Sequence, residues 1–68
     1  MKKIIGERLN ELRLDKNLTI KQLSKLTALS ESSISRWEND QADIKAEHII
    51  RLAKFFCVTT DYLLGMED

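Results

Sequence analysis

The residues of this chain that are best suited to bind a polar partner lie in one segment, residues 30–39. Its apolar members, Ile34 and Trp37, are three positions apart, which is the spacing of one buried helix face. A rotation of about 100° per residue then turns four hydrogen-bonding side chains to the opposite face: Ser32, Ser35, Arg36 and Asn39. Hydroxyl, amide and guanidinium groups on one face could bind the polar edges of bases or phosphate oxygens.

A second short amphipathic helix is expected just before this segment, at residues 20–27. Its apolar residues, Ile20, Leu23 and Leu26, recur at helical spacing, and Thr19 precedes them as a candidate N-cap. Ser30 is the corresponding N-cap candidate for the helix at residues 31–39. A polar helix supported by another helix behind it is the geometry of a helix-turn-helix that reads the major groove of DNA.

Composition places the chain among small helical domains. It has 68 residues, no proline and two glycines, so we predict a single all-α domain covering residues 1–68. Cys57 is the only cysteine and His48 the only histidine, which excludes an internal disulfide and disfavours a metal site. No catalytic set and no Gly-rich phosphate loop occurs, so neither an enzyme nor a cofactor or small-molecule site is expected.

The sequence also predicts where in the cell the protein is found and gives no sign of a membrane segment. No apolar run approaches the roughly 20 residues that span a membrane, and the first residues contain no hydrophobic signal region. A single cysteine without an export signal agrees with a reducing, cytoplasmic setting.

The apolar periodicity predicts five helices, at about residues 3–16, 20–27, 31–39, 45–56 and 61–64. Asn17 is expected to end the first helix in the left-handed conformation, and Asp43 to cap the fourth. The fourth helix should bury four apolar residues: Ile49, Leu52, Ala53 and Phe56. Cys57 is expected to be buried or half-buried where that helix ends. Short alternating helices of this kind form a compact all-α bundle.

Several stretches resemble the Cro/repressor-type helix-turn-helix family, also called the XRE or lambda-repressor-like family. They are residues 18–23, the block Leu-Ser-Glu-Ser-Ser-Ile-Ser-Arg-Trp-Glu-Asn at 29–39, the opening at 8–13 and the tail at 52–65. The resemblance implies a five-helix DNA-binding domain in which helices 2 and 3 form the helix-turn-helix. It also implies a sequence-specific transcription regulator that binds double-stranded DNA as a homodimer on a two-fold-related operator, with repression the favoured activity.

The resemblance assigns a role to each matching position. The positions that read bases correspond to Glu31, Ser32, Ser35 and Arg36. Phosphate contacts correspond to Ser33 and Asn39, and Lys21 in the first turn of helix 2 is close enough to assist. Arg13 and Glu38 match a partly buried ion pair that joins helix 1 to helix 3.

Alternatives remain open at several of these positions. Arg36 could pair with guanine or with a phosphate. Glu31 could accept from cytosine, or could complement the positive end of helix 3. Lys21 and Lys25 could face DNA or solvent. Among Tyr62, Leu63 and Leu64, some side chains should cover the core, and any that remain exposed could form a dimer surface.

Three residues depart from the family pattern. Ile20 stands where a phosphate-contacting glutamine is common, Ala28 replaces the glycine of the turn, and Asp40 replaces another frequent glycine. The chain also has 11 basic and 11 acidic residues, so its net charge is zero. Few phosphates can be neutralised per protomer, and we expect modest affinity for DNA unless two copies bind together.

These departures favour a second hypothesis, a protein-interaction module that keeps the scaffold and binds DNA weakly or not at all. The sequence also leaves open whether the regulator represses or activates. Because little chain follows the fifth helix, it is expected to be either a complete minimal regulator or the amino-terminal part of a longer one.

Overall fold

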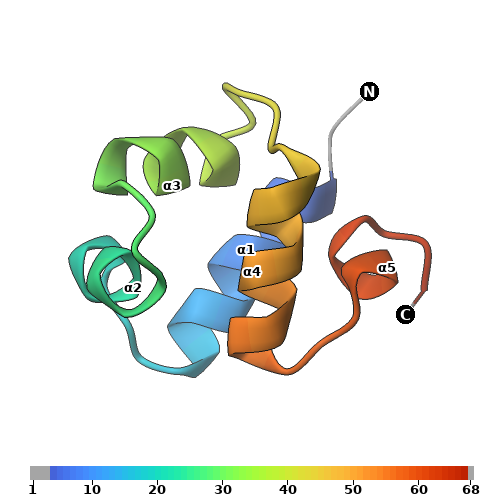
Figure 1. The fold of residues 1–68 in the computed structure, drawn as a ribbon, viewed down its shortest axis with the longest axis horizontal. Helices are drawn as coiled ribbons and strands as arrows, with labels where there is room; N and C mark the ends of the chain where they lie inside the picture. Colours follow the sequence, from blue (N-terminus) through green and yellow to red (C-terminus); the bar gives the residue numbers. More distant parts are fainter. Residues whose placement is uncertain (1–3, 68) are drawn as a thin grey trace.

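The computed structural model describes residues 4–67, and five helices without strands run through this stretch (Figure 1). The helices are α1 (Ile4–Asp15), α2 (Ile20–Thr27), α3 (Glu31–Glu38), α4 (Ala46–Phe56) and α5 (Thr60–Leu63). This arrangement confirms the predicted all-α fold, with boundaries that differ by one residue at most. The predicted start at Lys3 lies outside the described residues. Between residues 4 and 67, no helix is both long and apolar enough to cross a membrane.

The core lies where all five helices meet. The Leu9, Leu23, Ile34, Leu52 and Leu63 side chains are fully buried, one from each helix, and further apolar residues close the cluster around them. The first helix packs against α3 and α5, while α2 packs against α3 and α4. Therefore α3 is supported from behind by both α1 and α2, and its remaining face is free to point outward.

Side-chain caps start three of the helices. Thr19 Oγ1 accepts from the Gln22 N–H at 3.1 Å, and Gln22 Oε1 accepts from the Thr19 N–H at 2.8 Å, so α2 begins with a complete capping box. Ser30 Oγ accepts from the N–H of the third residue of α3 at 3.1 Å. Thr59 caps α5 in the same way. The predicted N-caps of α2 and α3 are confirmed.

Four residues with positive φ end or follow the first four helices: Asn17 (56°), Ala28 (61°), Asp40 (57°) and Cys57 (58°). Asn17 adopts the predicted left-handed conformation. Ala28 is the C-cap of α2, and a Cβ in this conformation costs about 1–2 kcal/mol, which a glycine would avoid. Cys57 ends α4 in the same conformation, and this reversal turns its side chain to solvent. The prediction of a buried or half-buried cysteine was wrong.

The buried face of α2 runs through Leu23 and Thr27, so Leu26 is 60% exposed. The Thr27 hydroxyl is accommodated inside because it donates to the Leu23 carbonyl at 2.7 Å.

The expected cap of α4 was also wrong. Asp43 is not the N-cap, because α4 starts at Ala46 with Lys45 as an N-cap that makes no side-chain bond. The preceding Ile44 packs against the core and so determines where the chain enters the helix.

The helices α1 and α3 approach each other closely at Gly6. A Cβ atom on this glycine would lie 2.4 Å from the Trp37 carbonyl oxygen and 3.2 Å from that of Glu38. Both contacts are with backbone, which cannot rotate away as a side-chain end could. A glycine inside a helix is normally unfavourable, but here it lets the carboxyl end of α3 pack directly on α1.

We expect the substitution Gly6→Ala to destabilise the protein by about 2 kcal/mol, because α1 and α3 must separate to admit the methyl group. This loss should occur although alanine favours helices over glycine by about 1 kcal/mol. The free energy of unfolding in urea measures the effect. Glu11→Ala, at an exposed position of the same helix, is the control and should change stability by less than about 0.5 kcal/mol. A Gly6→Ala variant as stable as the wild type would contradict the close α1–α3 contact.

Candidate nucleic-acid interface

The third helix has one buried side and one side open to solvent, at the edge of the molecule (Figure 1). Ile34 and Trp37 are buried in the core, as predicted. On the outer side, Glu31, Ser32 and Arg36 are exposed. Within residues 4–67 the Arg36 guanidinium forms no ion pair, so its donors are available to an external acceptor.

Local hydrogen bonds organise the amino end of α3. Ser30 Oγ donates to Ser33 Oγ at 2.7 Å, while it also accepts the N–H of Ser33. The Ser33 hydroxyl is half-buried and accepts this bond, so its own proton can still be donated outward. The first N–H groups of the helix have no partner within it. This end of α3 therefore offers several donors of the kind that bind phosphate.

The carboxyl end of α3 is closed by Asn39. Its backbone N–H and its side-chain Nδ2 both donate to the Ser35 carbonyl oxygen, at 3.1 and 2.8 Å. The second N–H of the amide is left for an outside acceptor. Ser35 itself is half-buried, so its hydroxyl is less accessible than that of Ser32.

Lys21 lies in the first turn of α2, the helix that packs against α3, and its side chain is exposed. Lys25 follows one turn later and is also exposed. Ile20, which stands where the family often has glutamine, is half-buried and packs against the core. At this position the chain therefore has a packing residue in place of a phosphate donor, and Lys21 is the cation nearest to it in sequence.

An ion pair between Arg13 and Glu38 joins α1 to the end of α3. Arg13 Nε donates to Glu38 Oε2 at 2.7 Å, and Arg13 Nη2 donates to Glu38 Oε1 at 2.9 Å. The two side chains are only 12% and 5% exposed. The hydrogen bonds to Glu38 raise the pKa of Arg13 above its usual value, against the opposing effect of burial. The predicted ion pair between Arg13 and Glu38 is therefore confirmed.

Two neighbouring groups complete the cluster around this pair. Asn10 Nδ2 donates to Glu38 Oε1 at 2.8 Å, and Arg13 Nη1 donates to the Leu18 carbonyl oxygen at 2.8 Å. One guanidinium thus connects α1, the α1–α2 connection and α3. Because a bidentate pair has a defined geometry, it determines how α3 is rotated on the core and which residues face outward.

Sequence reasoning missed two of the residues that position α3, Gly6 and Asn10. The sequence contained an indication of each role. Gly6 is a glycine inside a predicted helix, which often has a packing reason. Asn10 precedes Arg13 by three residues, so the two share a helix face.

We expect Glu38→Leu alone to destabilise the domain by about 3 kcal/mol, because it leaves the Arg13 charge buried without a partner. The double variant Arg13→Met/Glu38→Leu should recover most of this loss, since both charges are then absent. Urea unfolding of the wild type, Arg13→Met, Glu38→Leu and the double variant measures the interaction energy between the two side chains by a double-mutant cycle. Additive losses in the double variant would show that the two side chains do not interact in solution.

No group of three His, Cys, Asp or Glu side chains between residues 4 and 67 is placed to hold a metal ion. The surface around α3 offers hydroxyl, amide, guanidinium and backbone N–H donors, together with the carboxylate of Glu31. These groups suit the recognition of phosphates and base edges by hydrogen bonds.

Comparison with known sequences matches the chain to helix-turn-helix proteins. A family model described as a helix-turn-helix domain matches residues 6–68. The chain is 40% identical over 63 residues to the HTH-type transcriptional activator BcrR of Enterococcus faecalis, and 30% identical over 64 residues to the HTH-type transcriptional regulator ImmR of Bacillus subtilis (strain 168). These alignments cover 93% and 94% of this chain but 31% and 50% of the relatives. The chain thus spans a third to a half of their length.

Two solved structures superpose on most of the chain. The P22 c2 repressor protein, in a complex with a synthetic operator, superposes with a TM-score of 0.87 and 27% identity, covering 97% of this chain and 100% of that one. The restriction-modification controller protein C.AhdI from Aeromonas hydrophila gives a TM-score of 0.79 at 30% identity, with 87% and 89% of the two chains covered. The five helices therefore have the lambda-repressor-like arrangement.

Proposed function

Because the chain belongs to the Cro/repressor-type helix-turn-helix family of transcription regulators, we propose that it binds specific DNA sequences by inserting α3 into the major groove. The observation that carries the proposal is the outer face of α3, which is polar and exposed while Ile34 and Trp37 anchor the opposite face in the core. Similarity to a repressor in a complex with a synthetic operator supports DNA binding by this fold.

The proposed contacts fall into two groups. Arg36 donates two parallel bonds to a guanine edge, and three neighbouring side chains meet the adjacent bases: Glu31, Ser32 and Ser35. Lys21, Ser33 and Asn39 bind backbone phosphates on either side and so set the register of the helix. The serines donate or accept, so Arg36 supplies most of the discrimination.

The zero net charge argues for two copies on one operator. A protomer with 11 basic and 11 acidic residues is not drawn to DNA by its overall charge. Two linked protomers double the number of phosphate contacts and read two half-sites, one helical turn apart. Two protomers bound to an operator that overlaps a promoter would exclude the polymerase. We therefore propose that the protein represses transcription.

Selection of bound duplexes from a random pool tests this function. We expect recovery of an inverted repeat with half-sites whose centres are about 10 base pairs apart. Binding of the recovered duplex should weaken steeply as salt rises and should remain tighter than binding of a random duplex at every salt concentration. Recovery of no common sequence, together with a flat salt response, would instead favour the protein-interaction module.

On the selected duplex, Arg36→Ala should weaken binding about 10-fold to 100-fold and relax the preference at one base pair, because a bidentate pair to guanine is lost. Lys54→Ala is a matched control, since Lys54 is an exposed cation on α4 outside the proposed contacts. It should leave both affinity and preference unchanged. An Arg36→Ala variant with the wild-type base preference would refute this assignment of the reading residue.

A further inference from the structure

One side of α2 presents an apolar surface for which the proposed DNA contacts have no use. An open groove of about 270 Å³ lies there, lined by Leu18, Gln22, Lys25 and Leu26. We propose that this groove, termed the α2 groove, binds an acidic amphipathic helix of another protein. The binding itself is separate from the proposed function, and only its effect on DNA rests on that function.

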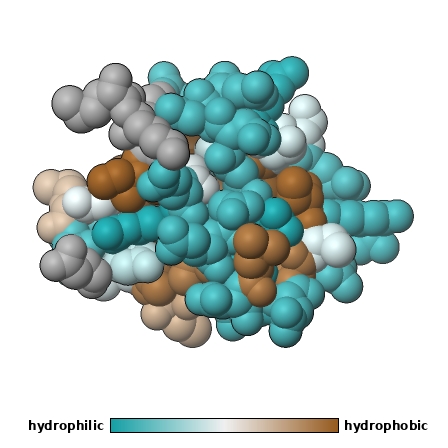
Figure 2. All heavy atoms as spheres, turned by 180° about the vertical axis from the view of Figure 1, so that it is seen from behind, coloured by the Kyte–Doolittle hydropathy of each residue, from teal (hydrophilic) through white to brown (hydrophobic). Residues whose placement is uncertain are grey.

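Leucine side chains form the apolar part of this surface. Leu26 is 60% exposed, and Leu14, near the end of α1, is 55% exposed. Leu18 packs partly against the core and also lines the groove. Figure 2 shows apolar groups right of centre, in the half of the molecule that contains α2, with hydrophilic surface around them. Phosphates would not bury these leucines, whereas an apolar face of a protein would.

Cations accompany the leucines. Lys21 and Lys25 are exposed, and α2 is the one member of the five described helices without an acidic residue. The two lysines are one turn apart, so they lie on the same side of the helix. Lys16 is also exposed, and Asp15 is the single acidic residue between residues 14 and 26. This segment is therefore positively charged in a chain whose net charge is zero, which favours an acidic partner.

The groove has a defined shape without a partner. The Leu18 N–H donates to the Arg13 carbonyl oxygen at 3.1 Å, and the Leu18 carbonyl oxygen accepts from Arg13 Nη1 at 2.8 Å. The Gln22 side chain is held by its bond to the Thr19 N–H in the capping box. A preformed surface costs little ordering entropy when a partner binds.

An amphipathic helix suits this groove better than other occupants. Such a helix places apolar side chains from successive turns in a groove, and acidic residues beside them would meet the lysines. The groove is smaller than the roughly 300–1,000 Å³ of typical small-molecule pockets. A second copy joined through α2 by a two-fold axis would bring Lys21 and Lys25 close to the same lysines of its partner, and like charges repel. A membrane surface requires a large apolar face, whereas most apolar residues of α2 face the core.

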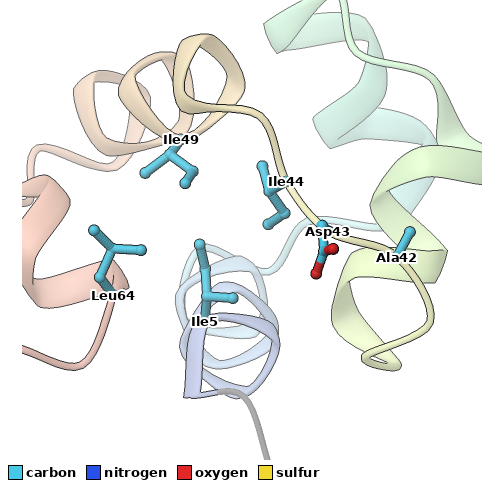
Figure 3. A pocket seen from close by; sticks show the side chains of 6 residues that line it. All are labelled: Ile5, Ala42, Asp43, Ile44, Ile49 and Leu64. Atoms are coloured by element: carbon cyan, nitrogen blue, oxygen red, sulfur yellow. The ribbon is translucent and has the colours of Figure 1, made fainter.

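Another hollow of similar size lacks the charge that an acidic helix requires. It has a volume of about 280 Å³ and lies between the start of α1, α4 and the end of α5 (Figure 3). Its lining is apolar, with Ile5, Ile49 and Leu64 among its residues, and its single charged member is Asp43. An acidic helix would meet no lining cation there, so the α2 groove is the site that fits this partner.

Occupation of the α2 groove would oppose DNA binding. Lys21 lies beside the groove and is also a proposed phosphate contact, so an acidic helix and the DNA backbone compete for the same cation. Carboxylates held next to phosphates would add repulsion. Each ligand therefore weakens the binding of the other by the same factor. A protein that carries such a helix would release the chain from its operator.

Selection from a displayed library of helical peptides tests the groove. Each peptide has about 18 residues, enough for a stable helix, and its surface positions are randomised among apolar, acidic, basic and neutral polar residues. We expect the wild type to enrich helices with large apolar residues at i, i+4 and i+7, flanked by Asp or Glu. Fluorescence anisotropy of the strongest peptide should show at least about 10-fold weaker binding to Leu26→Asp and to Lys25→Glu.

Two matched controls lie on α4, outside the groove. Ile50→Asp changes an exposed apolar residue, and Lys54→Glu reverses an exposed cation. Both variants should bind the peptide within about twofold of the wild type, because neither residue contacts it. Circular dichroism shows whether each variant is folded, and Leu26→Ser replaces Leu26→Asp if the latter unfolds.

The proposal is overturned if no helix is enriched, if the enriched helices are basic or uncharged, or if their binding does not depend on Leu26. Binding of the wild type to phosphatidylglycerol vesicles that Leu26→Asp abolishes would assign the surface to a membrane and overturn it as well. Undiminished affinity of the peptide-bound protein for the selected duplex would refute the competition with DNA. Failure of the proposed function is a different result, in which the duplex selection recovers no common sequence while the peptide still binds.

Discussion

The orientation of α3 depends above all on the ion pair between Arg13 and Glu38. The carboxylate is almost fully buried and accepts two bonds from Arg13 and one from Asn10. Any rotation of α3 about its axis would break these bonds and leave a charge without a partner inside the protein, which is strongly unfavourable. Gly6 acts with the pair, since its missing side chain allows the carboxyl end of α3 to rest on α1. Together they determine which residues of α3 face outward.

This arrangement divides α3 into an anchoring side and a side available for binding. The anchor is apolar, while the outer side carries small hydroxyls, one guanidinium and the carboxylate of Glu31. With a net charge of zero, long-range attraction to DNA is small. Proposed recognition therefore depends on short-range hydrogen bonds and on the rigid placement of the helix. The proposed binding of two protomers to one operator would double the number of these contacts.

Many local features of the fold could be predicted from the sequence because they depend on neighbouring residues. Thr19 and Ser30 start their helices through bonds to N–H groups three residues away, and Asn17 follows the first helix in the left-handed conformation. Residue spacing also predicted the inward side of α3. The five helices and the candidate reading face therefore followed from periodicity, caps and family resemblance.

Other features were decided only by tertiary packing. In α2 the polar Thr27 is buried while Leu26 is exposed, because the positions of the neighbouring helices decide which side of α2 is covered. The role of Gly6 depends on a backbone about 30 residues away in the chain. The sequence by itself determined which segments are helical and which face of α3 is polar, since both follow from local bonding and periodicity. How tightly the helices approach, and which apolar residues stay exposed, depends on shape complementarity between segments distant in the chain.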